Sequence, residues 1–461
     1  MSLSFLDRER TVASRGYNRW LIPPAALAVH LSIGEVYAFS VFKNPLVTHF
    51  DTSLTAIGAI FSIAIVMLGL SAAVLGTWVE RVGPRTAMFA AAVCWSSGFA
   101  IGSLGVATEQ LWIVYLGYGV VGGIGLGIGY ISPVSTLIKW FPDRPGLATG
   151  LAIMGFGGGA LIASPLSENL LGAFADKPED AIVPAFLTLG VLYLITMMLG
   201  AFTVRVPADD WRPEGYTPPT EENAKSMQTT GDVTAARAIR TPQFWLLWTV
   251  LFCNVTAGIG ILEQASPMIQ DFFSDIDSKE AAGFVGLLSL ANMAGRFIWS
   301  STSDVIGRKP IYMGYLGIGA IAYFLLASSG TAGIALFVAV TAVILSFYGG
   351  GFATIPAYLK DMFGGLEVGA IHGRLLTAWA AAGIAGPTIV NRVADSQEAA
   401  GKEGPDLYTL SLYIMVGVLV VGFVANLLLR PVDERHHVNT EDETEQDATE
   451  KSEPDYAEEA R

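Results

Sequence analysis

Charged side chains and cysteines are both scarce in this 461-residue chain. Charged residues make up 15% of it, against about a quarter in soluble domains, whereas hydrophobic residues make up 52%. The only cysteines, Cys94 and Cys253, both lie inside apolar stretches, so a disulfide framework is not expected. This composition excludes an ordinary soluble domain and a small disulfide-stapled one.

Several motifs that carry chemistry are also missing. The sequence has no Gly-x-x-x-x-Gly-Lys-[Ser/Thr] loop, which argues against an ATP-driven pump. It has no His/Cys/Asp/Glu cluster with metal-ligand spacing and no nucleophile elbow, so we expect no catalytic residue, no metal, no cofactor and no enzyme activity. Gly117-x-Gly119-x-x-Gly122 spells a dinucleotide fingerprint but lies inside an apolar stretch, where small residues indicate close helix packing.

The hydrophobic residues are gathered into about twelve blocks, each long enough for an α-helix to cross roughly 30 Å of hydrocarbon. They predict an all-α membrane protein in a lipid bilayer, and continuous runs of this kind do not fit a β-barrel. The blocks are 20–42, 55–78, 86–107, 111–138, 146–173, 184–204, 243–270, 281–302, 311–329, 331–358, 369–391 and 407–430.

Lys and Arg are distributed unevenly between the loops on the two sides of these blocks. Of the 27, 21 lie in the two termini, the central segment and the loops on that same side, and five lie on the other side. The bias places residues 1–19 and the C-terminus in the cytoplasm. Residues 431–461 carry most of the net charge of −14 and read as an acidic, disordered tail, and no nucleic-acid partner is expected.

The two halves of the chain resemble each other. Segment 205–242 is polar and proline-rich, and it predicts a cytoplasmic linker between six-helix bundles at 20–204 and 243–430. An acid, a glycine and a basic residue follow the second block of each half, around Gly83 and Gly307. Same-direction repeats of six helices are typical of transporters that bind their solute between the halves near the midplane.

These acid-x-x-Gly-basic loops resemble the signature of the major facilitator superfamily, and the resemblance covers the whole chain. It implies a monomeric carrier whose two bundles rock to give alternating access. It also implies a cytoplasmic gate built from Glu80, Arg81 and Arg85 in the first loop and Asp304, Arg308 and Lys309 in the second. The first loop departs from the usual pattern, with Glu for Asp and Pro84 before the Arg.

One ionisable residue, Arg296, lies deep inside a block. It precedes Asp304 by eight residues, or roughly 12 Å along a helix, and Asn292 lies one turn before it on the same face. A guanidinium matches a carboxylate through two parallel hydrogen bonds, and burying it without an anion is costly. A substrate anion is the favoured partner; an internal salt bridge or snorkelling to the cytoplasm are the alternatives.

Three stretches resemble the oxalate/formate antiporter branch and the related monocarboxylate carriers. They are Asn292-Met-Ala-Gly295-Arg296, Tyr37-Ala-Phe-Ser40-Val-Phe with Pro45-Leu46, and Thr377-Ala-Trp379 through Gly386-Pro387. The resemblance implies that Arg296 holds the substrate carboxylate, within a cavity whose candidate walls are Tyr37, Tyr130, Tyr348 and Trp379. Oxalate carriers have a further Lys where this chain has Ala382. With one fixed cation, a small organic anion with a single carboxylate, such as formate, lactate or pyruvate, is favoured, and oxalate comes second.

A carrier of this kind needs a driving coupling, either proton symport or anion exchange. The candidates for binding protons are His30, which titrates near neutral pH when unperturbed, and Glu35; we expect Glu35 and Glu263 nearer the outer ends of their helices. We expect a multi-pass protein of a prokaryotic cytoplasmic membrane. The competing functions are a drug or metabolite exporter of the same fold and a sensor that binds ligand without transporting it.

Overall fold

The structure is a computed structural model that describes residues 4–14, 16–52, 54–208, 211–217, 227–276 and 278–438. Within these ranges the chain is helical, and its only β-pairing is an isolated bridge between Val12 and Val206. The predicted all-α fold is therefore confirmed. Most of the predicted acidic tail, residues 439–461, lies outside the described residues.

In the first half, six helical runs correspond to the six predicted blocks. Two of the runs change helix type partway. The elements are α1 (Ile22–Ile33), η4 (Gly34–Ala38) and α2 (Ser40–Phe50); α3 (Leu54–Val82); α4 (Pro84–Ala107); α5 (Leu111–Val114), the π-helical η5 (Tyr115–Gly122) and α6 (Gly123–Trp140); α7 (Pro145–Phe174); and α8 (Ile182–Thr203).

The second half repeats this plan after a short helix in the linker. Its elements are α9 (Ala235–Ala238), α10 (Pro242–Phe272), α11 (Ser278–Ile306), α12 (Arg308–Ser329), α13 (Ile334–Phe363), α14 (Val368–Leu375), α15 (Thr377–Ala399) and α16 (Asp406–Leu428). Short 3₁₀ turns are η1 (Ser4–Leu6), η2 (Arg8–Thr11), η3 (Arg19–Leu21), η6 (Pro178–Asp180), η7 (Gly330–Ala332) and η8 (Glu434–His436).

Ten helices among the described residues are long and apolar enough to span a membrane. The two remaining runs are α11 and the pair α14–α15. α11 carries Asn292 and Arg296 in its interior, and the run of α14 and α15 is interrupted at Leu376.

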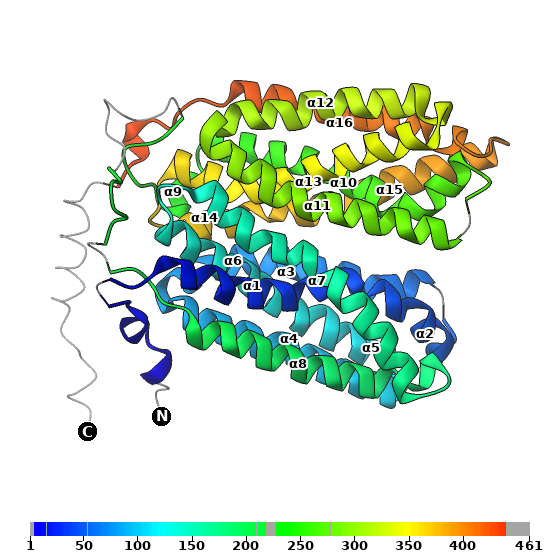
Figure 1. The fold of residues 1–461 in the computed structure, drawn as a ribbon, viewed down its shortest axis with the longest axis horizontal. Coiled ribbons are helices and arrows are strands. Elements are labelled where there is room, and N and C mark those ends of the chain that lie inside the picture. The colour runs from blue at the N-terminus through cyan, green and yellow to red at the C-terminus, as the bar shows by residue number, and fades with distance from the viewer. Residues whose placement is uncertain are drawn as a thin grey trace.

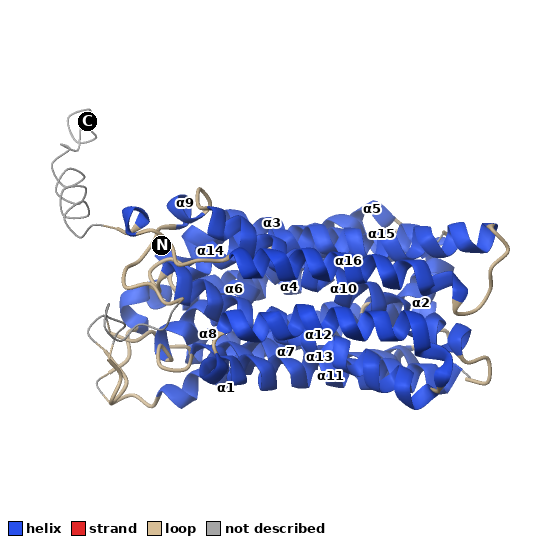
Figure 2. Ribbon diagram, turned by 90° about the horizontal axis from the view of Figure 1, so that it is seen from above, coloured by secondary structure: helices blue, strands red, loops and turns tan. Residues whose placement is uncertain are grey.

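The long helices lie side by side along one direction, as Figures 1 and 2 show. The first half and the second half form two layers in Figure 1, with α7 and α11 facing each other where the layers meet. The N-terminal segment, the linker and residues 430–438 all lie at the same end of the molecule. We call this the linker end; it is the end predicted to be cytoplasmic.

Two glycines shape equivalent turns in the two halves. Gly83 separates α3 from α4 with φ of 82°, and Gly307 separates α11 from α12 with φ of 98°. A residue with a Cβ rarely adopts this region, so both turns require glycine. The repeated motif seen in the sequence therefore encodes a repeated backbone conformation.

Candidate functional site

Arg296 is buried where the two halves meet, with 1% of its surface exposed. Its Nε donates to Asn292 Oδ1 at 3.1 Å, and Nη1 donates to the carbonyl oxygen of Ile153 on α7 at 3.1 Å. The guanidinium carbon lies 5.9 Å from the ring centre of Phe156 and 5.7 Å from that of Phe352. No carboxylate among the described side chains forms an ion pair with Arg296, and the two hydrogen bonds above use only part of the five N–H groups of a guanidinium.

The four aromatic residues predicted to line a cavity come together around these two phenylalanines. Phe156 packs edge-on against Tyr37 at 5.0 Å between ring centres, and Phe352 packs edge-on against Trp379 at 4.5 Å. Tyr130 contacts both Phe156 and Trp379, and Tyr348 contacts Phe352. Helices of both halves thus contribute to one aromatic cluster beside Arg296.

Four polar atoms of this cluster make no hydrogen bond of normal geometry to the described protein, although the hydroxyls of Tyr37 and Tyr348 lie close to each other. They are the hydroxyls of Tyr37, Tyr130 and Tyr348 and the indole nitrogen of Trp379, all shielded from solvent. Leaving a buried donor without an acceptor costs about 1–3 kcal/mol. Donors of this kind beside a buried cation are a costly arrangement for a core, but a suitable one for binding an oxygen-rich anion.

Phe156 and Phe352 are missing from the residues predicted from the sequence. Each sits in a glycine-rich stretch of a long helix, Gly155 to Gly159 on α7 and Gly349 to Gly351 on α13. The glycines let neighbouring backbones come close, as where Gly159 packs on the backbone of Leu31. Both are apolar residues in apolar helices, so no signal in the sequence distinguishes them from core residues.

His30 lies on α1 with its imidazole fully buried. Nδ1 is 2.7 Å from the carbonyl oxygen of Ala152, and Nε2 is 3.1 Å from that of Tyr130. The ring stacks on Tyr130 at 5.3 Å between centres. His30 therefore adjoins the aromatic cluster from the side of the first half.

Glu35 lies in the middle of the first helical run, because that run continues through α2 to Phe50. Its side chain is completely buried and accepts a hydrogen bond from the Tyr118 hydroxyl at 2.9 Å. The expectation that Glu35 lies near an outer helix end is therefore wrong: the apolar block ends at residue 42, but the helix does not. The side chain of Glu263 lies outside the described residues.

At the linker end, Asp304 joins the two halves. Its carboxylate accepts from the backbone N–H groups of Gly146 and Leu147 at 2.9 Å each, at the start of α7. Arg308 donates to Asp304 at 2.6 Å and to Asp361 at 3.0 Å. A carboxylate at a helix N-terminus is stabilised by the helix dipole and by the free N–H groups there.

Glu80 makes the corresponding connection from the first half. It accepts from Ser135 at 2.5 Å, forms an ion pair with Lys139, and accepts from the backbone N–H of Gly369 at 3.1 Å. Gly369 lies at the start of α14, so each loop acid contacts the beginning of a helix in the other half. We call Glu80, Asp304 and Arg308 with these partners the linker-end contacts.

The described hydrogen bonds of the other three predicted gate residues do not join the two halves. Arg85 donates to the carbonyl oxygen of Phe5 at 2.9 Å and so holds the N-terminal segment against α4. Lys309 donates to Leu427 and Leu429 at the end of α16, within its own half. Arg81 is exposed.

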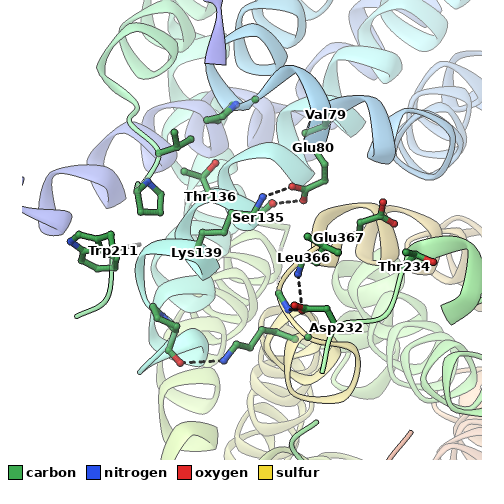
Figure 3. A pocket seen from close by; sticks show the side chains of 18 of the residues that line it. Val79, Glu80, Ser135, Thr136, Lys139, Trp211, Asp232, Thr234, Leu366 and Glu367 are labelled. Carbon is green, nitrogen blue, oxygen red and sulfur yellow. Dashed lines mark hydrogen bonds and ion pairs between the residues drawn. The ribbon is translucent and has the colours of Figure 1, made fainter. Parts of the chain in front are cut away.

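A pocket of about 720 Å³ lies at the linker end between the two halves. Figure 3 shows Glu80 with Ser135 and Lys139 on one side of it, and Asp232 of the linker with Leu366 on the other. Asp232 accepts from the N–H groups of Gly365 and Leu366 at 2.7 and 3.0 Å. The linker is therefore attached to the second half directly beside the linker-end contacts.

Two halves of membrane-spanning helices, joined at one end and enclosing a buried cation between them, define a membrane transporter. The sequence profile of the Major Facilitator Superfamily matches residues 25–277 and again residues 265–454. The chain belongs to this superfamily, whose members are transporters rather than enzymes, and it is an integral multi-pass membrane protein.

The names of several related proteins refer to the transport of organic anions. The chain is 27% identical over 376 residues to the "Oxalate:formate antiporter" of Oxalobacter formigenes, which covers 80% of this chain and 83% of the relative. It is 27% identical to the "Apicoplast pyruvate carrier 1" of Toxoplasma gondii, over 69% of this chain and 66% of that one. "Monocarboxylate transporter 11" of Homo sapiens is 28% identical over 40% of this chain and 37% of its own length. These relatives confirm the predicted branch of the superfamily.

Solved structures share the fold at low sequence identity. The transporter FucP in the outward conformation superposes with a TM-score of 0.65 at 14% identity, covering 89% of this chain and 99% of that one. A bacterial homologue of the iron transporter ferroportin in an outward-facing state gives a TM-score of 0.63 at 14% identity, over 88% and 98% of the two chains.

Proposed function

We propose that this protein is a secondary active carrier that moves a small organic anion, most favourably a monocarboxylate such as formate, lactate or pyruvate, by alternating access. The single observation that carries the proposal is Arg296, a buried guanidinium that no described carboxylate neutralises and that is surrounded by unpartnered hydrogen-bond donors. An anionic ligand would neutralise the charge of the guanidinium and accept hydrogen bonds from the donors around it. The names of the relatives support the same class of cargo.

The preference for one negative charge rests on the cations available. Ala382, where oxalate carriers have Lys, is buried on α15. Arg374 lies on α14, on the other side of the interruption at Leu376 from Trp379. A dianion bound at Arg296 alone would keep one charge without a partner in a low-dielectric site. Oxalate therefore remains the second candidate, supported by the antiporter relative.

We assign the structure to a state that is closed at the cytoplasmic side. The linker-end contacts join the halves there, through Asp304 to α7 and through Glu80 to α14. Breaking them would let the halves separate and admit solute from the cytoplasm. In this proposal the protein works as a monomer in a prokaryotic cytoplasmic membrane, with proton symport and anion exchange as the two possible couplings.

Transport in reconstituted vesicles tests the proposal. Arg296→Lys keeps the charge but loses the planar fork, so uptake of labelled formate or lactate should fall at least about tenfold, since a hydrogen bond to a charged group contributes about 1.5–3 kcal/mol. Arg392→Lys, at an exposed position on α15, is the matched control and should transport normally. Equal uptake by both variants would show that Arg296 does not hold the substrate.

The competing exporter function requires Arg296 to be held by an internal acid. Its described partners are instead an amide oxygen and a backbone carbonyl oxygen. Purified protein that is stabilised against heat by neutral apolar compounds, and not by carboxylates, would favour the exporter. Ligand binding without flux would favour the sensor.

A further inference from the structure

Two arginines lie side by side where α4 begins and α8 ends, at the linker end of the molecule. Arg85 is the second residue of α4, and Arg205 follows the last residue of α8, Thr203, by two positions. Both guanidinium groups donate to the same atom, the carbonyl oxygen of Phe202, from Arg85 Nη2 at 3.5 Å and from Arg205 Nη1 at 3.1 Å. The two positive charges are therefore close enough to repel each other.

No acidic side chain among the described residues offsets this repulsion. Neither arginine forms an ion pair there, and their other hydrogen bonds also go to backbone carbonyl oxygens. Arg85 donates to Phe5 at 2.9 Å, and Arg205 donates to Val204 at 2.8 Å. Nε of Arg85 is shielded from solvent and has no hydrogen-bond partner. A carbonyl oxygen accepts a hydrogen bond but carries no full negative charge, so both guanidinium charges remain unneutralised.

The backbone around Arg205 is held in place by other parts of the first half. The indole nitrogen of Trp140 donates to the carbonyl oxygen of Arg205 at 2.7 Å. The next residue, Val206, donates to Thr11 at 3.0 Å and accepts from Ala13 at 2.9 Å. These contacts lie within the first half, the N-terminal segment and the start of the linker. The arginine pair therefore does not depend on the contacts that join the two halves.

The pair lies where α8 leaves the membrane. Phe202 is in the last turn of this membrane-spanning helix, and its ring packs against that of Phe5 with 6.0 Å between centres. Both residues are 42% exposed, as expected for aromatic residues that contact lipid at the edge of the bilayer. Figure 1 shows the N-terminal segment beside these helix ends. An arginine just beyond such a helix end lies at the level of the lipid headgroups.

We infer that Arg85 and Arg205 bind the phosphate of an anionic phospholipid, such as phosphatidylglycerol, in the leaflet at the linker end. A guanidinium donates two parallel hydrogen bonds to phosphate oxygens, and the phosphate charge would remove the repulsion between the arginines. Arg205 is half-buried and makes the contact, whereas Arg85 lies behind it, 9% exposed, and contributes its charge. Anionic lipids are typical of leaflets that face the cytoplasm, and this end is the one predicted to be cytoplasmic.

Thermal stability of the purified full-length protein in a neutral detergent tests the inference. Phosphatidylglycerol, phosphatidylcholine and inorganic phosphate are titrated separately, and each rise in Tm is measured against the lipid-free Tm of the same variant, since a ligand stabilises the native state according to its occupancy. Phosphatidylglycerol should raise the Tm, and phosphatidylcholine, whose headgroup has no net charge, should raise it less. Inorganic phosphate should leave the Tm unchanged, because it lacks the acyl chains that contact the helix surface beside the arginines.

Arg205→Gln should weaken the binding of phosphatidylglycerol about fivefold or more, the factor expected of one basic side chain near an anionic lipid surface. Arg430→Gln is the matched control, because Arg430 follows the last residue of α16, Leu428, by two positions and is exposed, but its side chain shares no acceptor with a second cation among the described residues. It should respond to phosphatidylglycerol like the wild type. If Arg205→Gln does not fold, native mass spectrometry of the wild type replaces it: the protein should retain phosphatidylglycerol in preference to phosphatidylcholine, and equal retention of both would overturn the inference.

Equal weakening by Arg205→Gln and Arg430→Gln would also overturn it, because any basic residue at a helix end would then have the same effect. A rise in Tm with inorganic phosphate that Arg205→Gln abolishes would overturn the lipid assignment and identify a free anion as the ligand. Asp209 and Asp210 lie outside the described residues. If phosphatidylglycerol acts only after both are replaced by Asn, these acids and not a lipid neutralise the pair. None of these outcomes bears on carboxylate binding at Arg296, which the transport assay tests separately.

Discussion

Replacing Asp304 by Asn should shift the protein away from the state closed at the linker end. The carboxylate accepts from two N–H groups at the start of α7 and from Arg308 of its own half. An amide keeps one acceptor oxygen but turns an NH₂ group toward donors that need an acceptor. The substitution thus weakens the connection between the halves without removing side-chain volume.

The size of the shift follows from the bonds that change. Hydrogen bonds to a charged partner contribute about 1.5–3 kcal/mol each, and the helix dipole adds about 0.3–1 kcal/mol. Solvation of the freed groups in the open state offsets part of this, so we expect a net loss of about 2–3 kcal/mol. That corresponds to a change of about 30- to 150-fold in the ratio of the closed to the open state.

Distances between spin labels on the two halves would measure the change. Arg81 and Leu366 are exposed at the linker end, one in each half, and can be labelled as cysteines after Cys94 and Cys253 are replaced by Ala. The unsubstituted background should give mainly the short distance. Asp304→Asn should give a substantial population at a longer one.

Asp433→Asn serves as the control, since that carboxylate is exposed and its described contacts lie within its own segment. It should leave the distances unchanged. If Asp304→Asn also leaves them unchanged, the contact with α7 does not hold the linker end closed, and the reasoning from charge and helix N-terminus is refuted.

Three further outcomes are expected. Gly307→Ala should lower stability by about 1–2 kcal/mol, seen as a lower Tm, whereas Gly314→Ala, at a helical glycine with open space around it, should not; equal effects would contradict the requirement for positive φ. Tyr118→Phe should cost about 1–3 kcal/mol of stability by leaving the buried Glu35 carboxyl without its donor, and an unchanged Tm would show that water or another group replaces it. Phe352→Leu should weaken carboxylate binding measured by calorimetry, by about threefold or more through loss of the ring beside Arg296, and an unaltered Kd would remove Phe352 from the site.

The sequence was most informative where a residue conflicted with its surroundings. Arg296 stood out because a charge inside an apolar block has no ordinary explanation, and the structure shows it buried between the halves. Gly83 and Gly307 stood out because the same motif follows the second block of each half, and both adopt a positive φ. Conflicts of this kind can be recognised in the amino-acid sequence before any tertiary contact is known.

The sequence was less informative about residues that fit their surroundings. Phe156 and Phe352 are apolar residues in apolar helices, so nothing in the pattern separates them from core residues until the ring contacts are known. The same holds for Lys139, whose pairing with Glu80 depends on how α3 and α6 pack. Hydropathy also predicted that the first helix ends at residue 42, although helical structure continues to Phe50.

The sequence by itself determined the helical membrane fold, the two-fold repeat, the superfamily and the one deeply placed cation, because hydropathy, loop charge and motif spacing are properties of the chain alone. Only the tertiary structure decided which groups surround that cation, which loop acids reach the opposite half, and that His30 lies between two carbonyl oxygens. The reason is physical: these arrangements depend on contacts between groups far apart in the chain, such as His30 with Ala152, Arg296 with Ile153 and Glu80 with Gly369, and sequence periodicity carries no information about such contacts.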